Sequence, residues 1–228
     1  MKKYLTILKL ISCFLLLNID SLLAIDIIQV DVGNSINFTG ILNMPATELV
    51  NPNNHGTDMA KALQSELKIQ KSKPVDAKQL VWEHGPFGRS SLIQALAEAI
   101  YEHPKVLSLS YGGSRMDSLE EAILITHAVN DTVIVAAAGN QGGGREYYPA
   151  NYTNSCILSV GTTIDGKKAD YSNHADVWLE YNPKDPSGTS ASTARMAGIV
   201  LQLRRNYPYY KCDKIVLTMR MLYGSLKK

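Results

Sequence analysis

Short apolar runs that alternate with amphipathic segments are the feature that most restricts the fold of this chain. Two of these runs, Val106–Leu109 and Val133–Ala138, are almost wholly apolar over the length of a β-strand. In other segments, such as Ser91–Tyr101, apolar residues recur at spacings of three and four, which is typical of a helix buried on one side. Apolar strands that alternate with such helices predict a parallel sheet covered by helices on both faces.

Seven further segments fit the same alternation, and the chain shows no internal repeat, low-complexity tract or interdomain linker. Its 228 residues, 45% of them hydrophobic, are enough for one domain with a substantial core. We expect further strands at Ile25–Val32, Leu80–Trp82 and Ile157–Val160, and further helices at His55–Leu67, at Leu119–Val129 and from Ser190 to Leu203, with one more helix closing the chain.

The first 24 residues have the order of a secretory signal peptide. Two lysines precede an apolar run at 4–17, and Ala24 offers a small residue for cleavage. The run is too short and too interrupted for a membrane span. We therefore divide the chain into a signal peptide at 1–24 and one domain at 25–228. We expect the mature protein to be secreted, extracellular or periplasmic, with no membrane attachment.

Charge and cysteine content restrict the partners and the compartment. Without the first 24 residues the chain keeps 20 basic and 20 acidic side chains, a formal charge of zero. A neutral chain with no basic cluster argues against nucleic acid and anionic membrane surfaces as partners. Cys156 and Cys212 remain as an even pair in a chain bound for an oxidising compartment.

Polar residues stand where the expected strands end and helices begin, and a parallel sheet brings such positions to one edge. Asp31 ends the first strand and Asn140 follows the strand Val133–Ala138. His55 and Ser190 each begin a helix. An imidazole can take the proton of a serine hydroxyl, and a buried carboxylate fixes the tautomer of that imidazole. An amide side chain and an N–H at the start of a helix can stabilise the oxyanion that forms.

These residues lie in segments that resemble motifs of the subtilase family. His55–Thr57, Ala137–Asn140 and Gly188–Ser192 resemble the histidine, oxyanion-asparagine and serine motifs, and Ser108–Gly113 is similar to the substrate-binding strand. The order Asp, His, Ser also matches that of subtilisin. The resemblance implies a three-layer α/β sandwich with a mainly parallel, seven-stranded sheet. It also implies a secreted serine endopeptidase that cleaves polypeptides through an acyl-enzyme intermediate, with an Asp31-His55-Ser190 triad and Asn140 in the oxyanion hole.

The resemblance further implies a primary specificity pocket with two walls and a floor. Tyr147, just before a Tyr-Pro pair, takes the floor position of this pocket. A tyrosine there would fill much of the pocket and favour substrates with a small residue before the scissile bond. Alternatively, the alignment with the family slips at this point and Tyr147 is a surface residue. The residues of the two walls are Ser110, Tyr111, Gly112, Gly113, Ala138 and Gly139.

No cofactor is expected, and nothing in the sequence indicates a metal site. A structural calcium ion is left open without any indication for it.

The sequence departs from the family at several places, which keeps alternatives open. Val32 stands where the family usually has Ser or Thr after the catalytic Asp, so Asp26 competes with Asp31, although only Asp31 lies at the end of its strand. Ala194 stands where the family usually has Pro. In such a fold the last helix need not pack beside the strand at Ile157–Val160, so we leave the pairing of the two cysteines open.

Asp31 lies only seven residues beyond Ala24, which leaves no room for the prosegment usual in this family. The domain then folds unaided, or a separate inhibitor or folding partner replaces the prosegment, or the domain is degenerate. The alternative function is therefore a catalytically silent, subtilase-like binding module. An esterase on another α/β fold is disfavoured because it would require a Gly-x-Ser-x-Gly motif.

Overall fold

The computed structural model describes residues 25–32, 36–39, 55–71, 73–82, 88–115, 118–144 and 146–226, and the expected signal peptide lies outside them. The described elements alternate as expected and confirm the α/β class. They are β1 (Ile27–Val32), β2 (Ile36–Thr39), α2 (His55–Ile69), β3 (Asp76–Trp82), α3 (Gly88–Tyr101), β4 (Val106–Leu109), α4 (Ser118–Val129), β5 (Val133–Ala137), β6 (Ile157–Ile164), β7 (Lys167–Lys168), β8 (Val177–Glu180), α5 (Thr189–Asn206) and α6 (Cys212–Tyr223).

The sheet is mainly parallel, as expected. Seven strands follow the order β2-β3-β1-β4-β5-β6-β7, and β8 pairs with β6 in addition, which brings the described sheet to eight strands. The pairs β3-β1, β1-β4, β4-β5, β5-β6 and β6-β8 are parallel, while β2 and β7 are antiparallel additions. The carboxyl ends of the parallel strands therefore share one edge, where Asp31, Ser110 and Asn140 are found.

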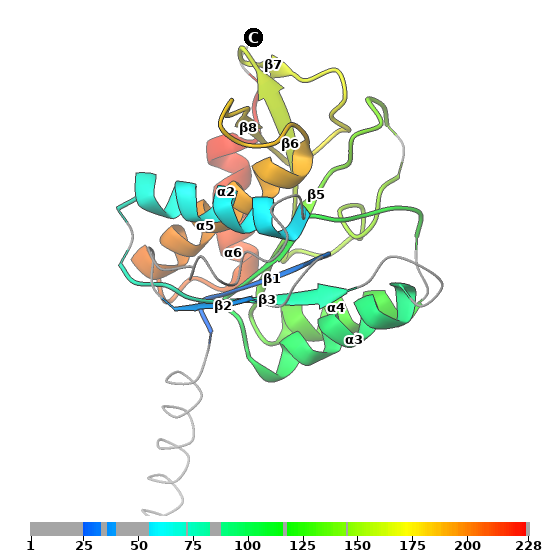
Figure 1. Ribbon diagram of the computed structural model, residues 1–228, viewed down its shortest axis with the longest axis vertical. Helices are drawn as coiled ribbons and strands as arrows, with labels where there is room; N and C mark the ends of the chain where they lie inside the picture. Colours follow the sequence, from blue (N-terminus) through cyan, green and yellow to red (C-terminus); the bar gives the residue numbers. More distant parts are fainter. Residues whose placement is uncertain are drawn as a thin grey trace, which may run out of the picture.

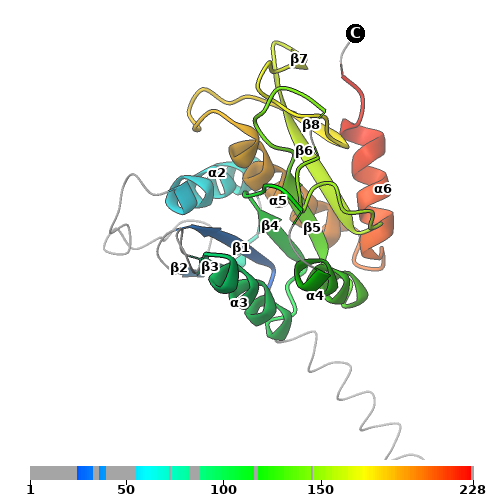
Figure 2. The same ribbon diagram turned by 90° about the vertical axis from the view of Figure 1, so that its right-hand side faces the viewer.

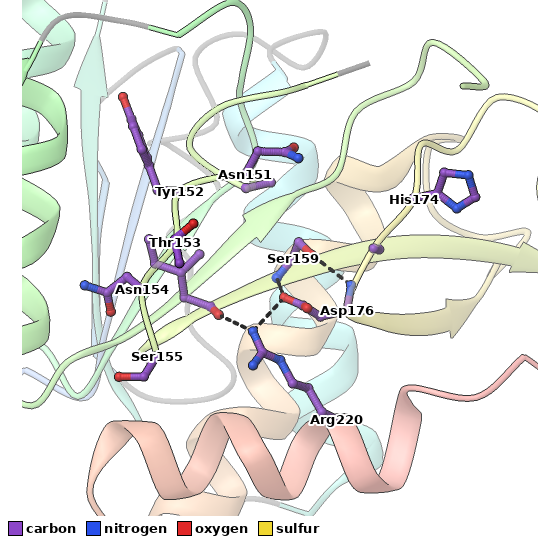
Figure 3. A pocket seen from close by; sticks show the side chains of 12 residues that line it. Asn151, Tyr152, Thr153, Asn154, Ser155, Ser159, His174, Asp176 and Arg220 are labelled. Carbon is purple, nitrogen blue, oxygen red and sulfur yellow. Dashed lines mark hydrogen bonds and ion pairs between the residues drawn. The ribbon is translucent and has the colours of Figure 1, made fainter. Parts of the chain in front are cut away.

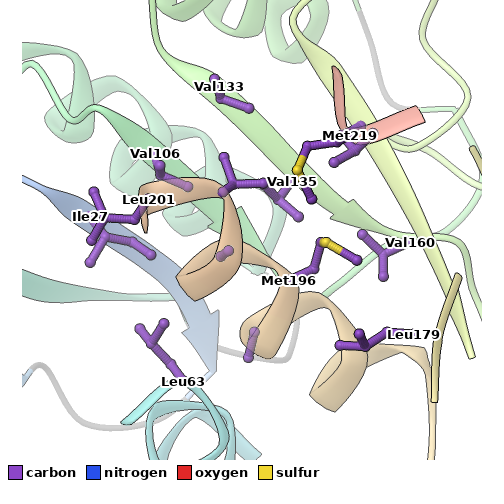
Figure 4. Packing of buried hydrophobic residues seen from close by; sticks show 14 of the residues in the cluster. Ile27, Leu63, Val106, Val133, Val135, Val160, Leu179, Met196, Leu201 and Met219 are labelled. Carbon is purple, nitrogen blue, oxygen red and sulfur yellow. The ribbon is translucent and has the colours of Figure 1, made fainter. Parts of the chain in front are cut away.

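Helices cover both faces of the sheet, so the molecule has three layers (Figures 1 and 2). Helices α2, α5 and α6 lie on one face, and α3 and α4 lie on the other. Each face has its own apolar cluster. In the cluster under α5, Met196 lies next to Val160 and Leu201 lies next to Ile27 (Figure 4). Fully burying each such side chain stabilises the fold by about 1.5–3 kcal/mol.

Cys156 and Cys212 form a disulfide, with their Cα atoms 5.1 Å apart. The pairing that the sequence left open is therefore present. It joins the residue before β6 to the first residue of α6, because α6 packs against β5 and β8 on the same face of the sheet. No helix in the described part of the chain is long and apolar enough to cross a membrane.

Candidate active site

Asp31 and His55 form a close pair at the carboxyl edge of the sheet. Asp31 lies in β1 with a 1% exposed side chain, and its Oδ1 is 2.6 Å from Nδ1 of His55, the first residue of α2. This hydrogen bond raises the pKa of His55 above its ordinary value, against the opposing effect of burial. The buried carboxylate therefore favours the tautomer with a proton on Nδ1, which leaves Nε2 able to accept a proton.

The competing carboxylate, Asp26, is engaged elsewhere. It precedes β1 and accepts hydrogen bonds from Lys105 Nζ at 2.8 Å and from the backbone N–H of Asp76 at 3.1 Å, and it pairs with Arg205. These partners hold it at the opposite edge of the sheet from His55. Of the two candidates, the structure thus brings Asp31 to the imidazole.

Ser190 lies at the start of α5, next to the end of β4. Its Oγ donates to the backbone oxygen of Ser110 at 3.1 Å, and Ser110 Oγ donates to the backbone oxygen of Ser190 at 3.0 Å. Among the described side chains, the hydroxyl of Ser190 is thus bonded to Ser110 and not to His55. Catalytic hydrogen bonds are often long or misaligned in a site without substrate, so this geometry is compatible with a nucleophile.

Asn140 follows β5, and its amide has a fixed orientation. Oδ1 accepts hydrogen bonds from the backbone N–H of Thr189 at 2.9 Å and from its Oγ1 at 3.0 Å. The amide oxygen is therefore directed at the start of α5, and the NH₂ group remains as the donor end. Gly188, which precedes α5 with φ +117°, lies close beside it: a Cβ built there would be 3.2 Å from Asn140 Nδ2.

The ring of Tyr147 lies between the two expected walls of the specificity pocket. A Cβ built on Gly112 would be 2.6 Å from its Cδ1, and one built on Gly139 would be 2.8 Å from the same atom. Tyr148 pairs with Gly113 through two backbone hydrogen bonds, which fixes the adjacent chain. Burial raises the pKa of Tyr147. The phenol ring is thus half-buried between Gly112 and Gly139.

Two residues at the site were not expected from the sequence. Glu120, in α4, is fully buried and accepts hydrogen bonds from Tyr111 at 3.3 Å and Tyr152 at 2.8 Å, and the first of these reaches the segment after β4. Asn173, between β7 and β8, binds the segment that carries Asn140. The sequence around neither residue carries a motif; only the contacts identify them.

A hollow of about 580 Å³ lies elsewhere, between the segment before β6 and helix α6 (Figure 3). Arg220 reaches from α6 to Asp176, whose carboxylate also accepts the N–H of Ser159. Of the described residues that line this hollow, none belongs to the candidate site. The described part of the chain holds no group of three or more His, Cys, Asp or Glu side chains arranged for a metal ion.

Comparison with known proteins gives one consistent family. The model of a family described as the subtilase family matches residues 42–223. A thermostable alkaline protease of Halalkalibacterium halodurans is 25% identical over 184 residues, which is 72% of this chain and 50% of that protein. Thermitase of Thermoactinomyces vulgaris is 32% identical over 126 residues, 48% of this chain and 44% of that protein. The chain thus spans about half the length of these curated relatives.

Solved structures agree on the fold. A cold adapted subtilisin-like serine proteinase matches with a TM-score of 0.67 at 17% identity, covering 87% of this chain and 82% of that chain. The self-cleaved protease domain of PatA matches with a TM-score of 0.62 at 19% identity, covering 89% of this chain and 93% of that chain.

Proposed function

This chain belongs to the subtilase family, and on that premise we propose that it is a serine endopeptidase whose catalytic residues are Asp31, His55, Ser190 and Asn140. The observation that carries the proposal is the 2.6 Å hydrogen bond between His55 and the buried Asp31. Two segments that are far apart in the sequence supply this pair at the sheet edge where α5 also begins. A buried carboxylate that orients an imidazole is the arrangement that a serine nucleophile needs.

The reaction proceeds in two halves. Ser190 Oγ attacks the carbonyl carbon of the scissile bond while His55 Nε2 takes its proton, so a C–O bond forms and the carbonyl π electrons become an oxyanion. Collapse of this intermediate breaks the C–N bond, and His55 gives the proton to the leaving amine. Water then attacks the acyl-enzyme by the same route and releases the carboxylic acid. Asp31 stays ionised throughout and stabilises the imidazolium.

The oxyanion forms between α5 and the segment after β5. The backbone N–H of Ser190, at the positive end of α5, and the NH₂ group of Asn140 are the two donors we assign to it. Thr189 holds the oxygen of the Asn140 amide, so the NH₂ group is already directed before the charge develops. Such preorganisation is the main source of the rate increase from an oxyanion hole.

We also propose that the protein acts outside the cytoplasm on polypeptide substrates. The Cys156–Cys212 disulfide supports this compartment, because structural disulfides persist in oxidising environments. N-terminal sequencing of secreted material should begin near Ile25, while a mature protein that starts at Met1 would contradict the expected export.

Labelling with a serine-directed fluorophosphonate tests the catalytic assignment. Wild type and Ser187→Ala, a matched change at an exposed serine of the same loop, should both be labelled at Ser190, and both should cleave peptides. Ser190→Ala should lose labelling and hydrolysis while it keeps its circular dichroism spectrum and Tm. A folded wild type that takes no label would instead support the catalytically silent binding module.

A further inference from the structure

Asn173 directs its backbone N–H and its side-chain amide at the segment that carries Asn140. Its backbone N–H donates to Gly139 O at 2.9 Å, and its Nδ2 donates to Ala138 O at 2.9 Å and to Gln141 Oε1 at 2.8 Å. Its Oδ1 accepts the backbone N–H of Gln141 at 3.1 Å. One side chain, 2% exposed, therefore binds the chain immediately before and immediately after Asn140.

The backbone before Asn140 has a conformation that favours glycine. Gly139 has φ +100°, a conformation that L side chains rarely adopt, and a Cβ there would be 2.6 Å from Asn173 Nδ2. The approach of Asn173 thus requires a glycine at position 139. Thr189 binds the side-chain amide oxygen of Asn140, and Asn173 binds the backbone on either side of Asn140. Both the side-chain amide and the backbone of Asn140 are therefore held in place.

Asn173 is itself anchored to the sheet. Ser172 Oγ accepts the backbone N–H of Thr162 in β6 at 3.2 Å and donates to Asn173 O at 3.0 Å. The ammonium group of Lys168 donates to Ser172 O at 2.6 Å. Thr162 Oγ1 also lies 2.8 Å from Ser192 Oγ in α5. A continuous set of hydrogen bonds therefore links β6, Asn173, the Asn140 segment and the helix that carries Ser190.

We propose that Asn173 is a positioning residue that sets the place and direction of Asn140 for oxyanion stabilisation. The proposal rests on the proposed peptidase function. An oxyanion donor acts only when its N–H lies within hydrogen-bonding distance of the developing charge, and displacement by about 1 Å can cost about 100-fold in rate. Loss of Asn173 should therefore lower kcat through Asn140, although Asn173 itself does not touch the reacting atoms.

Steady-state kinetics of Asn173→Ala, Asn140→Ala and the double variant test this coupling. Asn173→Ala should lower kcat by about 10- to 100-fold with KM changed by less than about 3-fold. In the Asn140→Ala background, the same substitution should lower kcat by about 2-fold or less, because the donor it positions is already absent. Asn154→Ala is the matched control: it removes a bond of the same kind, to Cys156 N at 2.8 Å, beside β6 at the other edge of the sheet.

Asn173→Asp is the second variant: it keeps the size and the Oδ1 acceptor, and it replaces the two Nδ2–H donors with a carboxylate oxygen that faces Ala138 O and Gln141 Oε1. It should also lower kcat with little change in KM. The proposal would be overturned if both Asn173 variants had the same kcat as Asn154→Ala. It would also be overturned if Asn173→Ala lowered kcat by the same factor in the Asn140→Ala background as in the wild-type background.

The side-chain amide resonance of Asn140, observed by ¹⁵N NMR, separates this proposal from the function on which it rests. Asn173→Ala should shift or broaden this resonance, whereas Asn154→Ala should leave it in place. If Asn173→Ala shifts the resonance, but the wild-type protein is not labelled and does not cleave peptides, the peptidase function is refuted and the positioning contact stands. An unmoved resonance in an active enzyme would refute the positioning role alone.

Discussion

Ser110 and Ser190 exchange two hydrogen bonds, each hydroxyl donating to the other's backbone oxygen at 3.0 and 3.1 Å across 80 residues of sequence. The end of β4 and the start of α5 are thereby joined at the proposed nucleophile. When a substrate binds, the hydroxyl of Ser190 has to turn from Ser110 to His55, whereas the bond from Ser110 Oγ can stay and hold the first turn of α5.

Ser110→Ala should therefore lower kcat by about 10-fold, because the first turn of α5 loses one of the bonds that place Ser190. Ser114→Ala, at an exposed serine in the same segment, should have no effect on kcat or KM. Both variants can be compared with one peptide substrate at saturating concentration. Equal kcat values for the two variants would show that the Ser110 hydroxyl does not contribute.

Asn140→Ala should lower kcat by about 10²–10³, with little change in KM. The amide NH₂ gains its partner only when the oxyanion forms, so its loss weakens binding of the transition state and not of the ground state. An increase in KM at constant kcat would contradict the oxyanion assignment and place Asn140 in substrate binding instead.

Tyr147→Gly should raise kcat/KM for peptides with Phe before the scissile bond, relative to Ala, by about 10-fold or more. The ring lies between Gly112 and Gly139, so its removal opens the slot for a larger side chain. The same substitution at Tyr209, whose side chain is 95% exposed, is the control and should leave the ratio unchanged. If Tyr147→Gly also leaves it unchanged, the ring does not form the pocket floor.

Activity should depend on pH through His55, whose pKa the hydrogen bond to Asp31 raises. The imidazole must be neutral to accept a proton, so the acidic limb of the kcat/KM profile should lie above the ordinary imidazole value of about 6.5. Asp31→Asn should move this limb to lower pH and lower kcat by about 10⁴. Asp26→Asn should leave the limb in place, because Asp26 lies among Lys105, Asp76 and Arg205. A shift caused by Asp26→Asn would reverse the assignment of the two carboxylates.

The sign of the accompanying stability effect follows from the same raised pKa. Protonated His55 stabilises the folded state fully below its unfolded pKa, and this contribution disappears as pH rises through the folded pKa. The difference in Tm between wild type and Asp31→Asn should therefore be larger at about pH 5.5 than at about pH 8.5. A difference that does not change with pH would contradict this linkage.

Removal of the disulfide should lower the free energy of unfolding by about 4 kcal/mol, the loop-closure value for a sequence separation of 56 residues. A Cys156→Ser/Cys212→Ser double variant, compared with wild type by urea unfolding, gives this difference directly. Thiol titration of unreduced wild type should find neither cysteine free. Two free thiols would show that the bond does not form in the purified protein.

Patterns of apolar residues were enough to predict most of the fold, because buried parallel strands such as Val106–Leu109 leave an uninterrupted apolar run. The strand at Val177–Glu180 was not predicted: it is four residues long and ends in Glu180, whose carboxylate binds the turn at Asp165 and Gly166. Its pairing with β6 is a tertiary contact that no local pattern encodes.

Candidate residues could be predicted where a side chain and its neighbours form a motif, as around His55 and Ser190. Glu120 and Asn173 could not, for different reasons. A glutamate in the first turn of a helix normally faces solvent, and the bonds from the hydroxyls of Tyr111 and Tyr152 help to make its burial tolerable. Asn173 lies in a loop, and its importance depends on bonds to residues more than 30 positions away.

Helix α5 is buried along most of its length, packed between the sheet and helices α2 and α6. The proposed nucleophile is therefore carried by a segment whose backbone amides can exchange with solvent only when the apolar cluster on that face separates. Helices α3 and α4 lie on the other face around a second apolar cluster, and Ala128 at the end of α4 also packs against the first. Opening of the second layer alone would leave the buried length of α5, and with it the serine, packed against the sheet.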